Sequence, residues 1–226
     1  MLRAAINYGT QCRVKGCADL LEVIKATSRY LAGSTKREIF FTFEQVIALR
    51  KAAHEDGRPN MALAYALVFE TTIRLYDVIL ELDWSHIDAD EVLKFTPTKT
   101  ERKTGLKVLF PLKLAPMVQE ELALYKGEKS GPVILMEGTD RRYSEAYISK
   151  LFRGHADAAE IPKEYVARDL RSSGITEARM FGADLGDLSK VAGHSSTQMT
   201  SMVYDRAALA AAQRVANIRN DNRTVH

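Results

Sequence analysis

The stretch MALAYALVFETTIR, residues 61–74, constrains the fold of this chain more than any other segment. It is apolar along nearly its whole length, which predicts a helix without a polar face. Such a helix cannot lie on a protein surface, so it should run through the core of a domain. The chain has 226 residues, enough for one large domain or for one domain with a small appendage.

Further helices and one hairpin are predicted around this central helix. Thr42 and Gln45 have the spacing of a capping box, so we expect a helix to begin there. Two β-prone runs, residues 92–96 and 107–112, are separated by a basic, turn-like segment, which predicts an antiparallel hairpin with a long charged tip. Other helical patterns cover residues 115–126, 144–160, 166–181, 184–194 and 207–218. The sequence therefore predicts a mainly α fold with one small antiparallel β-sheet (α+β).

The first forty residues look like the end of another domain. Apolar side chains at roughly helical spacing between residues 20 and 31 are followed by LAGSTKRE, a turn-rich and basic connector. We therefore expect residues 1–40 to be the last helix and linker of a preceding domain, which would make the chain a piece of a longer protein. The main domain is expected to be residues 41–226.

Several classes of protein are disfavoured by composition. No apolar run approaches the roughly eighteen residues of a membrane span, and the N-terminal segment lacks the apolar region of a signal peptide. Two cysteines, Cys12 and Cys17, are too few for a disulfide scaffold or a four-cysteine zinc site, and free thiols in a reducing cytoplasm are expected. The five histidines lack ligand-like spacing, so no metal and no cofactor are predicted.

The distribution of charge is more informative than the formal net charge of +3. Residues 94–107 contain five basic side chains and one acidic, and residues 1–38 contain seven basic and three acidic. Uneven basic patches on a nearly balanced chain suit a polyanionic partner such as nucleic acid. Basic loops that are simply solvated would give the same pattern, so charge leaves both explanations open.

Three arginines are candidates for binding an anion. Arg74 lies in TTIRLYD, at the end of the apolar segment, where a buried guanidinium without a partner would be costly. Its partner could be an anionic ligand or Asp77, three residues later. Arg168 and Arg171 share one helix face, and their charges repel unless an anion joins them.

Four more residues complete a candidate site, although each has an ordinary structural explanation when considered alone. Lys99 and Lys103 lie near the tip of the predicted hairpin, where lysines are usually solvated. His194 follows a glycine at a helix end, where a capping imidazole is common. Tyr204 could be one more packed aromatic side chain.

In their order along the chain, these residues resemble the tyrosine recombinases, the phage integrase family. The resemblance extends from about Phe41 to Arg206. It is carried by ETTIRLYDVILELDW, a basic hairpin, R-D-L-R, AGHSSTQMT and a tyrosine ten residues after the histidine. It implies the catalytic-domain fold of that family, and it implies that residues 1–40 are the end of the core-binding domain that precedes the catalytic domain.

The resemblance also implies a reaction and a role for each residue. Tyr204 would attack a DNA phosphodiester, giving a 3′-phosphotyrosine and a free 5′-hydroxyl, without metal or ATP. Arg74, Arg171 and His194 would stabilise negative charge on the phosphate, for which the planar, permanently charged guanidinium is well suited. Lys99 would protonate the departing 5′-oxygen.

Asp77 matches an acidic position of the family and would orient the arginine or histidine network. Lys103 also matches the hairpin lysine and remains the alternative to Lys99. Arg168 occupies a position where the family commonly has histidine, sometimes lysine; arginine can bind phosphate but cannot accept a proton near neutral pH. The spacing from His194 to Tyr204 is one residue longer than the family pattern.

Double-stranded DNA is the expected partner, in a homotetramer when the protein is full length and as a monomer for this fragment. A DNA-associated, cytoplasmic location without membrane contact is expected. The alternative is a DNA-binding relative that has lost cleavage. A metal-dependent nuclease or a protein-interaction module would leave Arg74, Arg171 and His194 without a common purpose.

Overall fold

The computed structural model describes residues 2–27, 38–97 and 107–192 of the chain. The chain divides into two compact units, Met1–Arg37 and Glu38–His226. The first unit contains α1 (Leu2–Gln11) and α2 (Cys17–Thr27), and none of its described side chains is buried. The assignment of residues 1–40 to the end of a core-binding domain stays a prediction.

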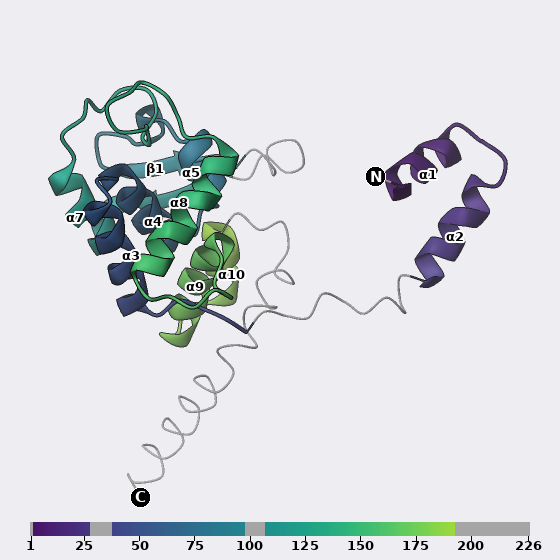
Figure 1. The fold of residues 1–226 in the computed structure, drawn as a ribbon. Coiled ribbons are helices and arrows are strands. Elements are labelled where there is room, and N and C mark those ends of the chain that lie inside the picture. Colours follow the sequence, from purple (N-terminus) through teal and green to yellow (C-terminus); the bar gives the residue numbers. More distant parts are fainter. Residues whose placement is uncertain (1, 28–37, 98–106, 193–226) are drawn as a thin grey trace, which may run out of the picture. The chain divides into compact units, whose positions relative to one another are not determined.

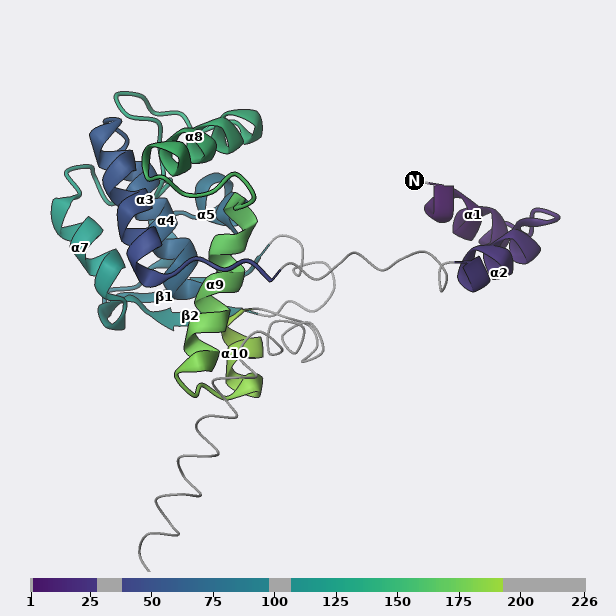
Figure 2. The same cartoon turned by 60° about the horizontal axis from the view of Figure 1, so that its bottom comes forward.

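The core of the second unit is built around α4 (Pro59–Thr71), as the apolar stretch predicts. Every residue from Met61 to Phe69 is buried, because α4 is covered by α3 (Phe43–Glu55), α7 (Pro116–Leu124) and α9 (Ala167–Met180). In the ribbon views α3 and α4 occupy the middle of the unit, with α7 on one side and α9 on the other (Figure 1 and Figure 2).

The predicted capping box at the start of α3 is confirmed. The Thr42 hydroxyl accepts the backbone N–H of Gln45, and the Gln45 side chain accepts the backbone N–H of Thr42. Two backbone donors that the first helical turn leaves without partners are thereby satisfied.

The predicted hairpin is also confirmed. Strand β1 (Val92–Phe95) pairs with β2 (Val108–Pro111) in an antiparallel, two-stranded sheet, with Val92 opposite Pro111 and Phe95 opposite Val108. The charged tip that joins the two strands lies largely outside the described residues.

Among the described residues, the remaining elements are one longer helix, α8 (Glu145–Ala158), and four short helices. The short helices are α5 (Leu75–Leu80), η1 (Trp84–His86), η2 (Leu112–Leu114) and α10 (Leu185–Val191). The helices predicted over residues 115–126, 144–160 and 166–181 are confirmed to within two residues at each end. Helix α5 was not predicted, because it has only six residues. The helix predicted over residues 207–218 lies outside the described residues.

The second unit thus has the predicted class, mainly α with a small antiparallel sheet. Within the ranges that the structure describes, no helix is both long and apolar enough to cross a membrane.

Candidate active site

Arg74 is placed by a sharp turn between two helices. Helix α4 ends at Thr71, three residues earlier than the apolar stretch, because Thr72 adopts the left-handed conformation with φ 55°. Backbone of this kind is unfavourable for a β-branched residue and redirects the chain. Arg74 then has extended backbone and forms the N-cap of α5, so its side chain leaves the protein core and is 26% exposed.

Arg74 forms the local ion pair that its spacing suggested. Its Nη1 lies 3.2 Å from Oδ2 of Asp77, one turn later in α5. Asp77 is buried, so its carboxylate holds the guanidinium in place from the protein side. This pair uses Nη1 of Arg74, and no other polar contact of the guanidinium is made within the described residues.

Arg171 reaches the same place from α9. A close crossing of α9 and α4 allows this, because a Cβ atom on Gly174 would lie 2.0 Å from the backbone oxygen of Phe69 and 3.4 Å from Cγ2 of Thr72. Only glycine permits that approach. Gly174 is one turn after Arg171, so the crossing brings the Arg171 turn of α9 to the turn that precedes Arg74.

The polar contacts of Arg171 are incomplete. Its Nη2 donates to the backbone oxygen of Ala192 at 2.6 Å, just after α10 and two residues before His194 in the sequence. Its Nη1 is buried and has no hydrogen-bond partner within the part of the chain that the structure describes. Leaving a buried charged donor unsatisfied costs on the order of 1–3 kcal/mol.

The electrostatics of Arg171 show that the two arginines are neighbours. Burial and the positive charge of Arg74 lower the pKa of Arg171 to about 10, and Asp77 opposes this shift. The guanidinium is therefore protonated at pH 7 but destabilised there. Two arginines and one carboxylate leave a net positive charge, and an anion between them would satisfy the free donor and reduce the repulsion.

Arg168 lies outside this cluster. It begins the same helix face as Arg171 but is exposed, and it makes no polar contact with other described residues. The structure therefore brings together Arg74, Asp77 and Arg171 and leaves Arg168 at the solvent-facing side. Lys99, Lys103, His194 and Tyr204 lie outside the described residues, so their predicted roles stay predictions.

Three features of the site escaped the sequence analysis: the left-handed turn at Thr72, the crossing at Gly174 and the carbonyl of Ala192. A glycine inside a helix is a weak signal for close approach. Gly154 in α8 shows why the signal is weak, since a Cβ atom there would meet nothing within 4 Å. A backbone carbonyl has no sequence signal.

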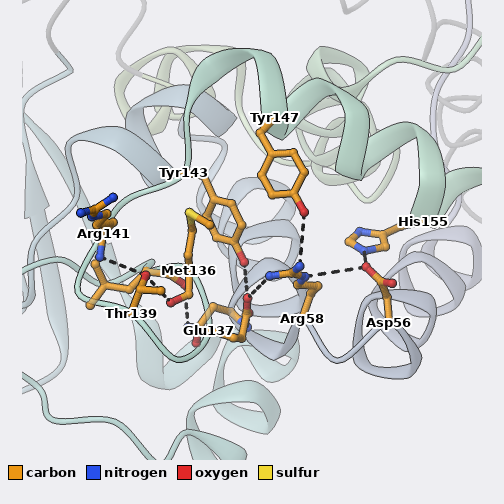
Figure 3. Close-up of polar contacts among 11 residues, drawn as sticks. Asp56, Arg58, Met136, Glu137, Thr139, Arg141, Tyr143, Tyr147 and His155 are labelled. Atoms are coloured by element: carbon orange, nitrogen blue, oxygen red, sulfur yellow. Dashed lines mark hydrogen bonds and ion pairs between the residues drawn. The ribbon is translucent and has the colours of Figure 1, made fainter.

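Two other regions could be mistaken for a site. A cavity of about 730 Å³ lies between the start of α4 and the loop after α7, and none of its lining residues is a predicted catalytic residue. A polar network of hydrogen bonds and ion pairs joins six side chains (Figure 3): Asp56, Arg58, Glu137, Tyr143, Tyr147 and His155. Across residues 2–27, 38–97 and 107–192, no group of three His, Cys, Asp or Glu side chains could hold a metal ion.

Comparison with known proteins identifies the fold. Residues 40–210 match the phage integrase family. A lambda integrase dimer bound to a COC′ core site is 21% identical with a TM-score of 0.63, covering 88% of this chain and 77% of that one. A XerA recombinase is 15% identical with a TM-score of 0.59, covering 89% and 76%, and the catalytic domain of bacteriophage HP1 integrase is 19% identical with a TM-score of 0.55, covering 74% and 87%.

The chain spans only 63% of a longer lambda integrase chain with which it shares 20% identity. No curated protein matches the chain by sequence. At these identities the likeness shows the fold, a helical unit with a small antiparallel sheet, and the chemistry has to be argued from the residues themselves.

Proposed function

The chain belongs to the phage integrase family, and we propose that it is a site-specific DNA recombinase that works through a covalent bond between Tyr204 and DNA. The arginine pair carries the proposal. Arg171 has a buried N–H group that finds no partner among the described residues, and it lies beside the guanidinium of Arg74. A phosphodiester supplies both the acceptor and the negative charge that this cluster lacks.

In the cleavage step, the hydroxyl oxygen of Tyr204 attacks the phosphorus of one DNA strand. The bond from phosphorus to the 5′-oxygen breaks, which leaves a 3′-phosphotyrosine. The phenol gives its proton to water or to a neighbouring acceptor, since Arg168 cannot take it. The departing oxygen takes a proton from Lys99, or from Lys103 if the hairpin presents that lysine, and leaves as a 5′-hydroxyl.

In the joining step, a 5′-hydroxyl of a second strand attacks the phosphotyrosine and releases Tyr204. One phosphodiester replaces another, so the exchange needs no energy from ATP. The phosphate gains negative charge on its nonbridging oxygens in both steps. Arg74 and Arg171, with His194, stabilise that charge with donors that are fixed before the substrate binds, which makes electrostatic catalysis effective.

The structures with this fold suggest the partner. One lambda integrase structure is a dimer bound to a core site and another is a tetramer bound to a Holliday junction. We propose that this chain likewise acts on double-stranded DNA, as a tetramer on two sites when its full length is present. The basic segments at residues 1–38 and 94–107 suit contact with phosphates.

The first unit fits a role as the end of a core-binding domain. Its two helices leave Leu2, Tyr8, Leu20 and Val23 more than half exposed. A helix pair without buried side chains has too little core to be stable alone. We assign residues 1–40 to a DNA-contacting domain whose other parts cover these apolar side chains.

Covalent capture on DNA tests the proposed function. The protein is mixed with nicked duplexes that carry candidate sites, in EDTA, so that cleavage releases a short fragment and traps the enzyme. We expect a protein–DNA adduct that resists SDS, with the linked peptide containing Tyr204, and no adduct for Tyr204→Phe. Binding to the same duplexes without an adduct would contradict this function and favour the relative that has lost cleavage.

A further inference from the structure

Helix α5 positions the Arg74–Asp77 ion pair but is too short to be stable on its own. It has six residues, and helices of this length are unstable without tertiary contacts. Its last turn leaves carbonyl groups without helical donors. The position of Arg74, the N-cap of this helix, therefore depends on the contacts that hold α5, including those at its far end.

Arg142 helps to fix that end, where the backbone oxygen of Leu82 also accepts the backbone N–H of Val133 at 3.0 Å. The Nη1 of Arg142 donates to the backbone oxygens of Ile79 at 3.1 Å and Leu82 at 3.2 Å, and its Nη2 donates to Oδ1 of Asp83 at 2.7 Å. Its positive charge lies at the carboxyl end of α5, where the helix dipole favours a cation. One guanidinium thus caps the helix and binds the segment that follows it.

The loop that carries Arg142 is itself rigidly held. The backbone N–H of Met136 donates to the oxygen of Arg141 at 2.8 Å, and Thr139 closes the turn between them (Figure 3). Gly138 supplies the left-handed residue that the turn needs, with φ 72°.

Glu137 joins the same loop to the other end of the α4–α5 segment. Its Oε1 accepts the backbone N–H of Asn60, in the first turn of α4, and its Oε2 accepts Nη1 of Arg58 at 3.2 Å and the hydroxyl of Tyr143 (Figure 3). The Arg58 Nη2 donates to the hydroxyl of Tyr147. The loop is therefore anchored at the start of α4 through Glu137 and reaches the end of α5 through Arg142.

From the contacts of Glu137 and Arg142 we infer that Arg142 is a positioning residue for the proposed phosphate site. Arg142 orients α5, and α5 in turn positions the side chains of Arg74 and Asp77. The inference rests on the proposed function, since it concerns the same site. Arg142 does not contact the phosphate. Its loss would displace the Arg74 guanidinium while leaving every phosphate ligand in the sequence.

The chain offers a matched control. Arg141 is the neighbouring residue, carries the same charge and is exposed, and its guanidinium has no polar partner within the described part of the chain (Figure 3). Arg141→Ala and Arg142→Ala change the net charge equally, but only Arg142→Ala removes the contacts with Ile79 in α5 and with Leu82 and Asp83 after it.

The test measures the urea midpoint of unfolding as inorganic phosphate is added at low millimolar concentrations and constant ionic strength. It compares the unaltered protein, Arg141→Ala, Arg142→Ala, Arg74→Ala and the double variant Arg74→Ala with Arg142→Ala. The rise of the midpoint with phosphate gives an apparent phosphate affinity for each protein. We expect Arg142→Ala to weaken the apparent phosphate affinity by about tenfold or more, since small displacements of a binding group have large effects. Arg141→Ala should leave the affinity unchanged. In the Arg74→Ala background, Arg142→Ala should cause no further loss.

Other outcomes separate the two claims. If Arg142→Ala lowers the midpoint without phosphate but keeps the phosphate affinity, Arg142 is only structural and the inference is wrong. The same holds if the losses from Arg74→Ala and Arg142→Ala multiply. If phosphate has no effect on the unaltered protein, the anion site itself is wrong, and the proposed function loses its support together with the inference. On cleavable DNA, Arg142→Ala should slow adduct formation at saturating DNA, and Arg141→Ala should not.

Discussion

Arg50 and Arg171 are both largely buried arginines, and they differ in what surrounds them. The Arg50 Nε donates to Glu121 at 2.7 Å and its Nη2 lies 2.9 Å from Glu120, so two carboxylates neutralise it. Burial and the positive charge of Arg74 lower the pKa of Arg171, and the buried Nη1 of Arg171 has no partner among the described residues. The first arrangement is complete within the protein. The second leaves a buried donor without an acceptor among the described residues, which is where we propose that an anion binds.

The difference shows how a structural arginine can be told from a binding arginine. Burial alone does not separate them, because Arg50 is buried and Arg171 is partly buried, with its Nη1 atom inaccessible to solvent. The two arginines differ in how many of their N–H donors lack an acceptor among the described residues, and in whether a nearby carboxylate neutralises their charge. Substitution of Arg50 should therefore mainly lower the stability of the fold, and substitution of Arg171 should mainly weaken anion binding.

The largest effect on stability is expected for Arg50→Ala. Removing the guanidinium leaves the carboxylate of Glu121, which is buried, with His54 as its remaining partner. Breaking a buried ion pair in this way costs about 3–5 kcal/mol in the free energy of unfolding, measured in urea. The exposed Arg168→Ala should change it by less than about 0.5 kcal/mol. Equal losses for the two variants would show that the Arg50 cluster does not stabilise the fold.

The largest effect on chemistry is expected for Arg171→Ala. We expect the rate of adduct formation at saturating DNA to fall by about 100- to 1000-fold, which corresponds to roughly 2.7–4 kcal/mol of lost transition-state stabilisation. The free energy of unfolding should change by less than about 1 kcal/mol, because an unsatisfied buried donor is removed together with one hydrogen bond. If Arg171→Ala caused a large loss of stability and left the rate of adduct formation unchanged, Arg171 would be a structural arginine like Arg50.

Two helix glycines test how the arginine pair is brought together. Gly174→Ala places a methyl group against the backbone of α4 and should destabilise the fold by about 1–3 kcal/mol while separating Arg171 from Arg74. Gly154→Ala fills open space in α8 and should stabilise it by about 0.5–1 kcal/mol. Urea unfolding measures both. If Gly174→Ala is tolerated like Gly154→Ala, the close crossing does not exist.

The smallest effect is expected at a pair of carboxylates on the same elements. Burial, followed by the charges of Glu70 and Glu44, raises the pKa of Glu177, and burial raises the pKa of Glu70. A raised carboxyl pKa means that the ionised form weakens the fold above the folded pKa, and that the weakening disappears below the unfolded value. Glu177→Gln should therefore stabilise the protein at pH 7 by less than about 1 kcal/mol and have no effect near pH 4. A gain that persists in acid would mean that packing, not charge, is responsible.

The sequence predicted the elements that depend on local pattern. The apolar stretch over residues 61–74 placed α4 in the core, the Thr42–Gln45 spacing placed the start of α3, and two β-prone runs placed the hairpin. Each of these signals lies within a few neighbouring residues, where periodicity and side-chain chemistry act directly.

The features that the sequence did not predict depend on distant contacts. The left-handed Thr72 ends α4 early, and nothing in TTIR marks that residue as special. The crossing at Gly174 and the clamp of Arg142 on α5 join segments that are separated by sixty residues or more. Such contacts follow from the packing of whole helices, which local pattern does not encode.

The Arg74–Arg171 cluster is proposed to be an anion site, and the Arg50 cluster is not. Both clusters can be observed in one experiment, by following the ¹⁵N–¹H signals of the arginine Nε groups while inorganic phosphate replaces chloride at constant ionic strength. We predict saturable shifts of the Arg171 and Arg74 signals and a stationary Arg50 signal. An Arg171 signal that stays in place, or an Arg50 signal that moves with it, would contradict the account.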